Sequence, residues 1–306
     1  MLAVRNTGAG IEAVTCDAPS GSGVRLRVAS AGICGSDLAF AAMGRRDYTY
    51  GHEIAGTTDD GRAWAVAPLL YCGACPQCAS GHIQRCQGEA AAVLGISRDG
   101  GMAEEIIVPE YMLIPVPAGL PVTDGCLVEP GSVAWHGIRR AAPVAGERVA
   151  VVGGGTVGLL AAAAARRMGL TADIETRYAH QARAAEKLGA GLTDGEYDVV
   201  VDAAGSPGAL ARCAELAKPG GRVVILGVYF DTAVLPGPTS LMKELTYINA
   251  MAYDHREFAD VAAMLADRPE IVEAVVTHRF PLTDAAEAFR VAGDRSAGAI
   301  KVVMHP

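Results

Sequence analysis

The sequence predicts an α/β fold, with a β-rich first half followed by a doubly wound parallel sheet. Residues 1 to about 125 are rich in glycine and carry short alternating apolar stretches, at 23–32 and 103–117, separated by turn residues. From about residue 146, an apolar strand, a glycine-rich turn and a helical stretch follow one another repeatedly. Strands that alternate with helices are typical of a parallel sheet covered by helices.

The second half supplies its elements in a regular order. ERVAVV (147–152) is an expected strand, GGG (153–155) a turn, and TVGLLAAAAARRMG (156–169) the helix after it. The expected segments that follow are a helix, two strands, a helix, a mixed segment and a final strand, at 180–190, 197–206, 221–227, 256–267, 275–293 and 299–306. We find no internal repeat and no low-complexity tract.

Composition limits the partners of this chain. It has 306 residues, and an apolar content of 51% with a mean hydropathy of +0.25 is enough for a large hydrophobic core. The net charge is −8, and the chain has no run of basic residues that would follow the phosphates of a nucleic acid. The N-terminus shows no secretory signal, and the longest apolar run (157–165) is far too short to span a membrane. We therefore expect a cytoplasmic globular protein that binds neither nucleic acid nor membranes.

Four of the eight cysteines fall within YCGACPQCASGHIQRC (71–86). A reducing compartment disfavours disulfides, so these cysteines are more readily metal ligands. Four thiolates around one ion make the closed tetrahedral shell of a structural zinc, although an iron–sulfur cluster or a redox role stays open; the terminal C-x3-C-P of bacterial clusters is absent. The predicted ligands are Cys72, Cys75, Cys78 and Cys86.

A reactive metal has to be sought among sparser residues, because a closed thiolate shell leaves no position for substrate. Cys34 lies in GICGSD, His52 and Glu53 are adjacent in GHEIAG, and Glu129 lies in LVEPGSVAWHG. Each is ordinary by itself: a lone cysteine is usually a small buried apolar side chain. Spacing alone cannot join them into one site.

The turn GGGTVG (153–158) has the G-x-G-x-x-G spacing that binds dinucleotides, between an expected strand and an expected helix. The first glycine allows the tight turn, the second lets a pyrophosphate approach the backbone, and the third lets helix and strand pack closely. The helix N-terminus then stabilises the phosphate charge. The candidate cofactor residues here are Gly153, Gly155, Thr156, Val157 and Gly158, together with Gly227 at the end of a later strand.

The cofactor itself is expected to be NADP, with NAD as the alternative. Glu175 lies 22 residues after Gly153 and is a possible ribose ligand. Thr176 and Arg177 follow directly, and an arginine at this point suits the 2′-phosphate of NADP, which a buried carboxylate would repel.

These motifs, in this order, resemble the zinc-dependent medium-chain dehydrogenase/reductase family, and EPGSV resembles its polyol, sorbitol and threonine dehydrogenase branch. The resemblance covers nearly the whole chain. It implies that Cys34 and His52 bind a catalytic zinc, with Glu53 and Glu129 as direct ligands or bridged through water. It also implies a GroES-like catalytic domain (1–128 and 272–306), a Rossmann domain (129–271), and a homodimer or homotetramer.

The resemblance implies reversible hydride transfer between a secondary alcohol, polyol-, cyclitol- or sugar-like, and NAD(P). Ser36 could take the alcohol proton. Ala39 stands where many relatives carry a proton-relay histidine, and the hairpin after GHEIAG is short, so proton exit and the rim of the site are expected to differ. Two alternatives are a zinc-free NADPH-dependent enoyl or quinone reductase and a nucleotide-binding protein without turnover.

Overall fold

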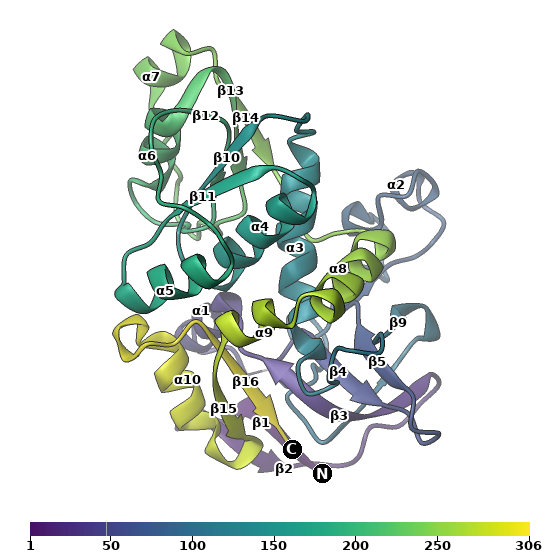
Figure 1. The fold of residues 1–306 in the computed structure, drawn as a ribbon. Helices are drawn as coiled ribbons and strands as arrows, with labels where there is room; N and C mark the ends of the chain where they lie inside the picture. Colours follow the sequence, from purple (N-terminus) through teal and green to yellow (C-terminus); the bar gives the residue numbers. More distant parts are fainter. Residues whose placement is uncertain (47) are drawn as a thin grey trace. The chain divides into compact units, whose positions relative to one another are not determined.

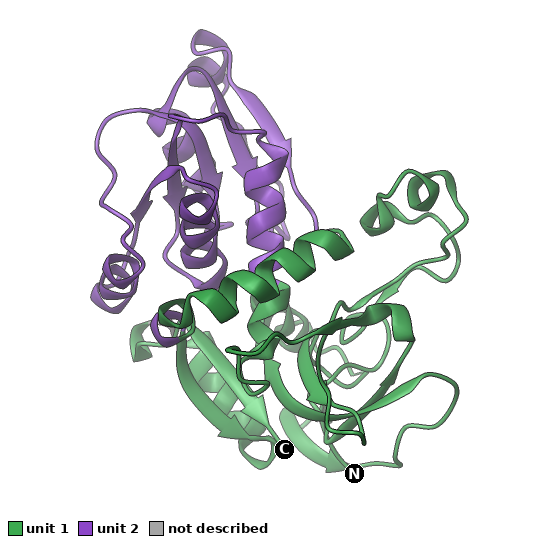
Figure 2. Cartoon of the chain, turned by 45° about the vertical axis from the view of Figure 1, so that its right-hand side comes forward, with its two compact units in different colours: residues 1–129, 254–272, 276–306 green, residues 130–253, 273–275 purple. Residues whose placement is uncertain are grey.

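The computed structural model describes residues 1–46 and 48–306. The chain divides into two compact units, which are coloured in Figure 2. Unit 1 comprises residues 1–129, 254–272 and 276–306, and unit 2 comprises residues 130–253 and 273–275. Both the β-rich first half and the parallel sheet of the second half are as predicted. Residues 254–271 lie in unit 1, whereas the sequence predicts them in the nucleotide-binding domain.

Unit 1 is built around an antiparallel sheet joined by the C-terminus of the chain. Its strands are, in sheet order, β15 (Val276–Pro281), β16 (Lys301–His305), β3 (Val24–Gly32), β4 (Glu53–Thr57), β5 (Ala63–Val66) and β9 (Leu113–Pro115), and β8 (Glu105–Val108) also pairs with β3. The parallel pair β15–β16 extends this sheet because β16 runs antiparallel to β3. The last residues of the chain therefore lie beside a strand from its beginning.

Smaller elements complete unit 1. They are two antiparallel strand pairs, β1 (Leu2–Asn6) with β2 (Ile11–Thr15) and β6 (Leu69–Leu70) with β7 (Ala92–Val93), and the helices α1 (Gly35–Ala42), α2 (Pro76–Ala79), α8 (His255–Asp267) and α10 (Ala285–Gly293). The hydrophobic core of this unit includes Leu26 and Ile54 from the sheet, Met102 from a loop and Phe289 from α10. Two further helices, α3 (Val128–Arg140) and α9 (Pro269–Val275), contribute residues to both units.

Unit 2 is a parallel sheet with the order β11 (Thr171–Glu175), β10 (Arg148–Val152), β12 (Tyr197–Asp202), β13 (Ala217–Ile225) and β14 (Thr246–Asn249), labelled in Figure 1. The helices of this unit are α4 (Thr156–Arg167), α5 (Ala179–Lys187), α6 (Ala209–Leu216) and α7 (Gly237–Met242). Helix α4 packs on β10 and β11, and α6 packs on β12 and β13. The two central strands, β10 and β12, are mostly apolar and almost wholly buried, as strands covered on both faces are.

One strand of the doubly wound pattern is reduced to a single bridge. The usual order 3-2-1-4-5-6 places a third strand outside the second. Here β11 has only the isolated bridge between Asp173 and Gly191 on that side, among the residues described. The sequence explains this, since residues 188–196 between α5 and β12 are too few for a strand and a crossover helix. No helix in the described part of the chain is long and apolar enough to cross a membrane.

Candidate active site and dinucleotide-binding turn

The structure brings three of the predicted catalytic residues together in unit 1. Cys34 precedes α1, His52 precedes β4, and Glu53 begins β4. One potential ligand atom of each lies within 4.8 Å of the others. Two ligands of one zinc ion lie roughly 3.3–3.8 Å apart at bond lengths of about 2.0–2.3 Å, so small side-chain movements would suffice for all three to bind the same ion. His52 and Glu53 are buried.

Glu129 lies outside this group of three. It is buried in the first turn of α3, within unit 1. Cys126, one turn earlier, is fully buried, and burial raises the pKa of its thiol to about 12. Neither side chain shares the 4.8 Å cluster of Cys34, His52 and Glu53.

Asp37 is a buried carboxylate beside the histidine, and the sequence motifs did not point to it. Its Oδ2 accepts a hydrogen bond from the Cys34 backbone N–H at 2.9 Å, and its Oδ1 lies 3.6 Å from His52 Nδ1. The other ring nitrogen, His52 Nε2, faces Ser36 Oγ at 3.4 Å. Burial alone would lower the pKa of His52, but the attraction of Asp37 and then of Cys34 raises it well above its ordinary value. A carboxylate behind a ligand histidine is the usual support of a metal site.

Lys301 is the second missed residue. From β16, its Nζ donates to Glu53 Oε1 at 2.7 Å, to Glu53 Oε2 at 2.6 Å and to the Ile33 carbonyl at 2.9 Å. Both charged side chains are buried, at 2% and 1% exposure. Gly32 makes room for them, because a Cβ there would lie 1.8 Å from Glu53 Oε2. A single lysine within AIKVVM, on a strand otherwise apolar, was the available signal for a buried partner.

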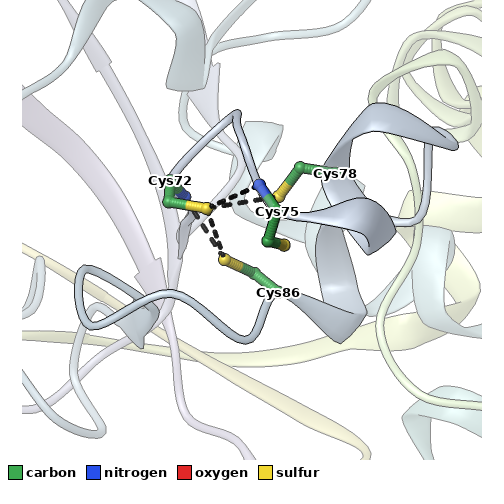
Figure 3. Close-up of side chains that lie close together, drawn as sticks. All are labelled: Cys72, Cys75, Cys78 and Cys86. Carbon is green, nitrogen blue, oxygen red and sulfur yellow. Dashed lines mark hydrogen bonds between the residues drawn. The ribbon is translucent and has the colours of Figure 1, made fainter.

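The four cysteines of residues 71–86 converge on one point, as Figure 3 shows. Their Sγ atoms lie within 4.8 Å of one another. The backbone N–H groups of Cys75 and Gly88 point at Cys72 Sγ and Cys86 Sγ, at 3.3 and 3.4 Å. Such backbone donors, from Gln87 and Cys78, lower the pKa of Cys75 to about 6, which favours the thiolate that zinc binds. This donor set fits a structural zinc.

The glycine turn of unit 2 has the three properties that a pyrophosphate site needs. Gly153 has a φ of +116°, a conformation that side chains disfavour. A Cβ on Gly158 would lie 1.8 Å from the Gly153 carbonyl oxygen, so helix α4 could not pack this closely on β10 with any other residue. A Cβ on Gly155 would meet nothing within 4 Å, which leaves open space beside the N-terminus of α4. Thr156 and Val157 form the first turn of that helix.

The remaining cofactor candidates lie at the carboxyl ends of the neighbouring strands. A Cβ on Gly154 would lie 2.8 Å from Thr176 Cγ2, so Thr176 faces the glycine turn. The exposed Arg177 guanidinium lies 5.6 Å from the centre of the Tyr178 ring. Gly227 packs so tightly on Gly205 that a Cβ would come within 2.3 Å of its backbone nitrogen.

Comparisons with known proteins agree with this geometry. Residues 20–118 match the family described as "Alcohol dehydrogenase GroES-like domain", and residues 156–267 match "Zinc-binding dehydrogenase". L-galactonate-5-dehydrogenase from Escherichia coli K12 is 30% identical, with 89% of this chain and 88% of that protein covered.

Two solved structures are similar over their whole length. Galactitol-1-phosphate dehydrogenase from Escherichia coli has a TM-score of 0.89 at 26% identity and covers 100% of both chains. A zinc-binding dehydrogenase from Sinorhizobium meliloti 1021, bound to NADP, has a TM-score of 0.88 at 28% identity and covers 100% of this chain and 99% of that one. The chain therefore belongs to the zinc-type medium-chain alcohol dehydrogenase family, whose reaction is hydride transfer between an alcohol and the corresponding ketone.

Proposed function

We propose that this dehydrogenase oxidises a secondary alcohol of the polyol, cyclitol or sugar-acid class, or reduces its ketone, with NADP preferred over NAD. The observation that carries the proposal is the convergence of Cys34, His52 and Glu53. A zinc-free enoyl or quinone reductase has no need of these ligands. The substrate class is supported by relatives named for polyols and sugar acids, such as L-galactonate-5-dehydrogenase, galactitol 1-phosphate 5-dehydrogenase and L-arabinitol 4-dehydrogenase.

Unit 1 is the proposed catalytic unit. Cys34 and His52 would hold the catalytic zinc, with Glu53 and Glu129 binding it directly or through water. When bound, the metal supplies Lewis acidity at the oxygen of the alcohol or ketone. Asp37 keeps the His52 ring oriented, and Lys301 fixes the Glu53 carboxylate and balances its charge. The cysteines of residues 71–86 would hold the structural zinc.

Ser36 is the proposed proton carrier. Its Oγ lies 3.4 Å from His52 Nε2, and a hydroxyl group can both accept and donate a hydrogen bond. During oxidation Ser36 would accept the proton of the alcohol while passing its own hydroxyl proton on to water, and during reduction the same relay would run in reverse. Since Ala39 cannot relay this proton further, its exit route would differ from that of relatives with a histidine at this point.

Unit 2 is the proposed NADP-binding unit. The pyrophosphate would lie at the open space beside Gly155 and receive hydrogen bonds from the N-terminus of α4. Arg177 would pair with the 2′-phosphate, because a guanidinium matches phosphate oxygens in a bidentate manner.

The decisive experiment combines metal analysis with a substrate panel. Wild-type protein is expected to hold two zinc ions per chain and to reduce NADP faster than NAD with polyols, cyclitols or sugar acids. Cys34→Ser should lose one zinc ion and activity while keeping its circular dichroism. Cys16→Ser is the matched control, since Cys16 belongs to neither cysteine cluster. A Cys34→Ser variant with full activity would refute the zinc mechanism, and alkene reduction without zinc would favour the reductase alternative.

We also propose a homodimer, or a tetramer built from dimers, formed through the β14 edge of unit 2. β14 pairs with β13 only, among the described strands, and Leu241 and Met242 of the preceding helix are 78% and 81% exposed. Light scattering should report two or four chains, and Leu241→Glu should lower that number. Leu192→Glu, an equally exposed site beside β11, should not. A wild-type mass of one chain would overturn this proposal.

We propose a reducing compartment such as the cytoplasm. None of the eight cysteines forms a disulfide, and five of them lie in the two candidate metal sites, where oxidation would prevent metal binding.

A further inference from the structure

Glu175, at the carboxyl end of β11, is already occupied by other side chains. Arg212 of α6 donates from Nε to Glu175 Oε1 at 2.9 Å and to Oε2 at 3.0 Å, and its Nη2 also donates to Oε1. Thr193 Oγ1 donates the fourth hydrogen bond to this carboxylate, to Oε1 at 2.8 Å. An ionised carboxylate offers about four acceptor positions. The charge of Glu175 is therefore balanced within the protein, and most of its hydrogen-bonding capacity is already used.

The position of this pair makes its charge relevant to the cofactor. An acidic side chain at the end of the second strand usually accepts hydrogen bonds from the ribose 2′-hydroxyl, which selects NAD. The next residue, Thr176, faces the glycine turn, and the exposed Arg177 follows. A 2′-phosphate carries roughly −1.5 to −2 charges, so an unpaired Glu175 would repel it while a neutralised one would not.

We propose that Arg212 is a cofactor-specificity residue: by pairing with Glu175 it withdraws this carboxylate from the ribose and lets the 2′-phosphate of NADP bind beside Arg177. The inference rests on the proposed binding of NADP by unit 2. Arg212 acts through Glu175 and is a positioning residue. It is held from its other side by Glu215, whose Oε2 accepts from Arg212 Nη1 at 2.9 Å. The hydrogen bonds from Arg212 also lower the pKa of Glu175, so the pair stays ionised at neutral pH.

The test is the ratio of dissociation constants for NADPH and NADH, measured by isothermal titration calorimetry on the full chain. Arg212→Met exposes the Glu175 charge and should weaken NADPH at least tenfold relative to NADH. Arg212→Met combined with Glu175→Gln removes that charge again and should restore the preference for NADPH. Lys218→Met is the matched control: it breaks the ion pair with Asp198 at the opposite, amino ends of β12 and β13, and should leave the ratio unchanged.

The outcomes separate this inference from the function on which it rests. If wild-type protein binds neither nucleotide, or prefers NADH, the proposed NADP-dependent function is overturned and this inference with it. If wild-type protein prefers NADPH but Arg212→Met keeps the same ratio, only the role of Arg212 is overturned. An equal loss of both affinities would likewise overturn it, because a purely structural role lowers both. Restoration by Glu175→Gln in the double variant supports it.

Discussion

Replacing Lys301 with methionine should destabilise unit 1 strongly. Lys301 Nζ has three short contacts, two of them to Glu53, and both side chains are almost fully buried. The methionine fills a similar volume but leaves the Glu53 carboxylate buried without its counter-charge. Removing one partner of such a pair costs about 3–5 kcal/mol. At roughly 2–4 °C per kcal/mol, the melting temperature of the unit should fall by about 6–20 °C.

Urea unfolding followed by circular dichroism measures this loss, with the zinc content of each variant determined alongside. Lys301→Met combined with Glu53→Gln should recover part of the lost stability, since no unpaired charge is then buried. The control is Arg27→Met in the same unit, whose ion pair with Asp59 is exposed on both sides and should contribute little. A Lys301→Met variant as stable as the wild type, or a double variant no better than the single, would refute the reasoning.

The same pair sets a pH dependence. Burial would lower the pKa of Lys301, but the attraction of Glu53 outweighs burial and raises it above its ordinary value. A raised lysine pKa stabilises the fold at any pH below the unfolded value of about 10.4 and loses this effect only as the pH rises through the folded value. The stability difference between wild type and the double variant Lys301→Met with Glu53→Gln, in which neither position can titrate, should therefore stay constant from pH 6 to 9. A marked change within that window would contradict the assignment.

Four further substitutions test other parts of the molecule. Gly158→Ala should lower the free energy of unfolding of unit 2 by about 1–3 kcal/mol, because the added Cβ meets the Gly153 carbonyl oxygen. Gly155→Ala should leave the stability unchanged but abolish nucleotide binding measured by calorimetry. Cys75→Ser should release one zinc ion and expose residues 71–86 to trypsin, seen by mass spectrometry. Hydrogen bonds from Arg222 lower the pKa of Glu147, so the stability difference between wild type and Glu147→Gln should shrink as the pH falls below about 4.5; a constant difference would refute that pairing.

The fold and the identity of the motifs were largely predictable from the sequence. Periodicity and glycine spacing are local signals, and β10, the glycine turn and α4 follow one another directly in the chain. The four cysteines also lie within sixteen positions, so their convergence needs only a small loop. These features require no knowledge of how distant segments meet.

Contacts between distant segments were not predictable in the same way. Lys301 and Glu53 are separated by 248 positions, and Arg212 and Glu175 by 37, so each pair depends on the sheet order and on the packing of α6. Asp37 carried a local signal, since an acidic residue three positions after a helix N-cap often accepts the backbone N–H of that cap. The segment between α5 and β12 is too short for a third strand and its helix, but this can be recognised only once the order of the strands in the sheet is known.

The reduced third strand gives the sheet of unit 2 two unequal borders. On the β11 side, the Ile174 N–H already donates to the Gly191 carbonyl, and Asp173 is engaged by Arg148 and Tyr197. Polar groups occupied in this way give an incoming strand little to pair with. Of the two borders, the β14 border is therefore the one that fits the proposed association, and copies that share this border would form a closed two-fold pair.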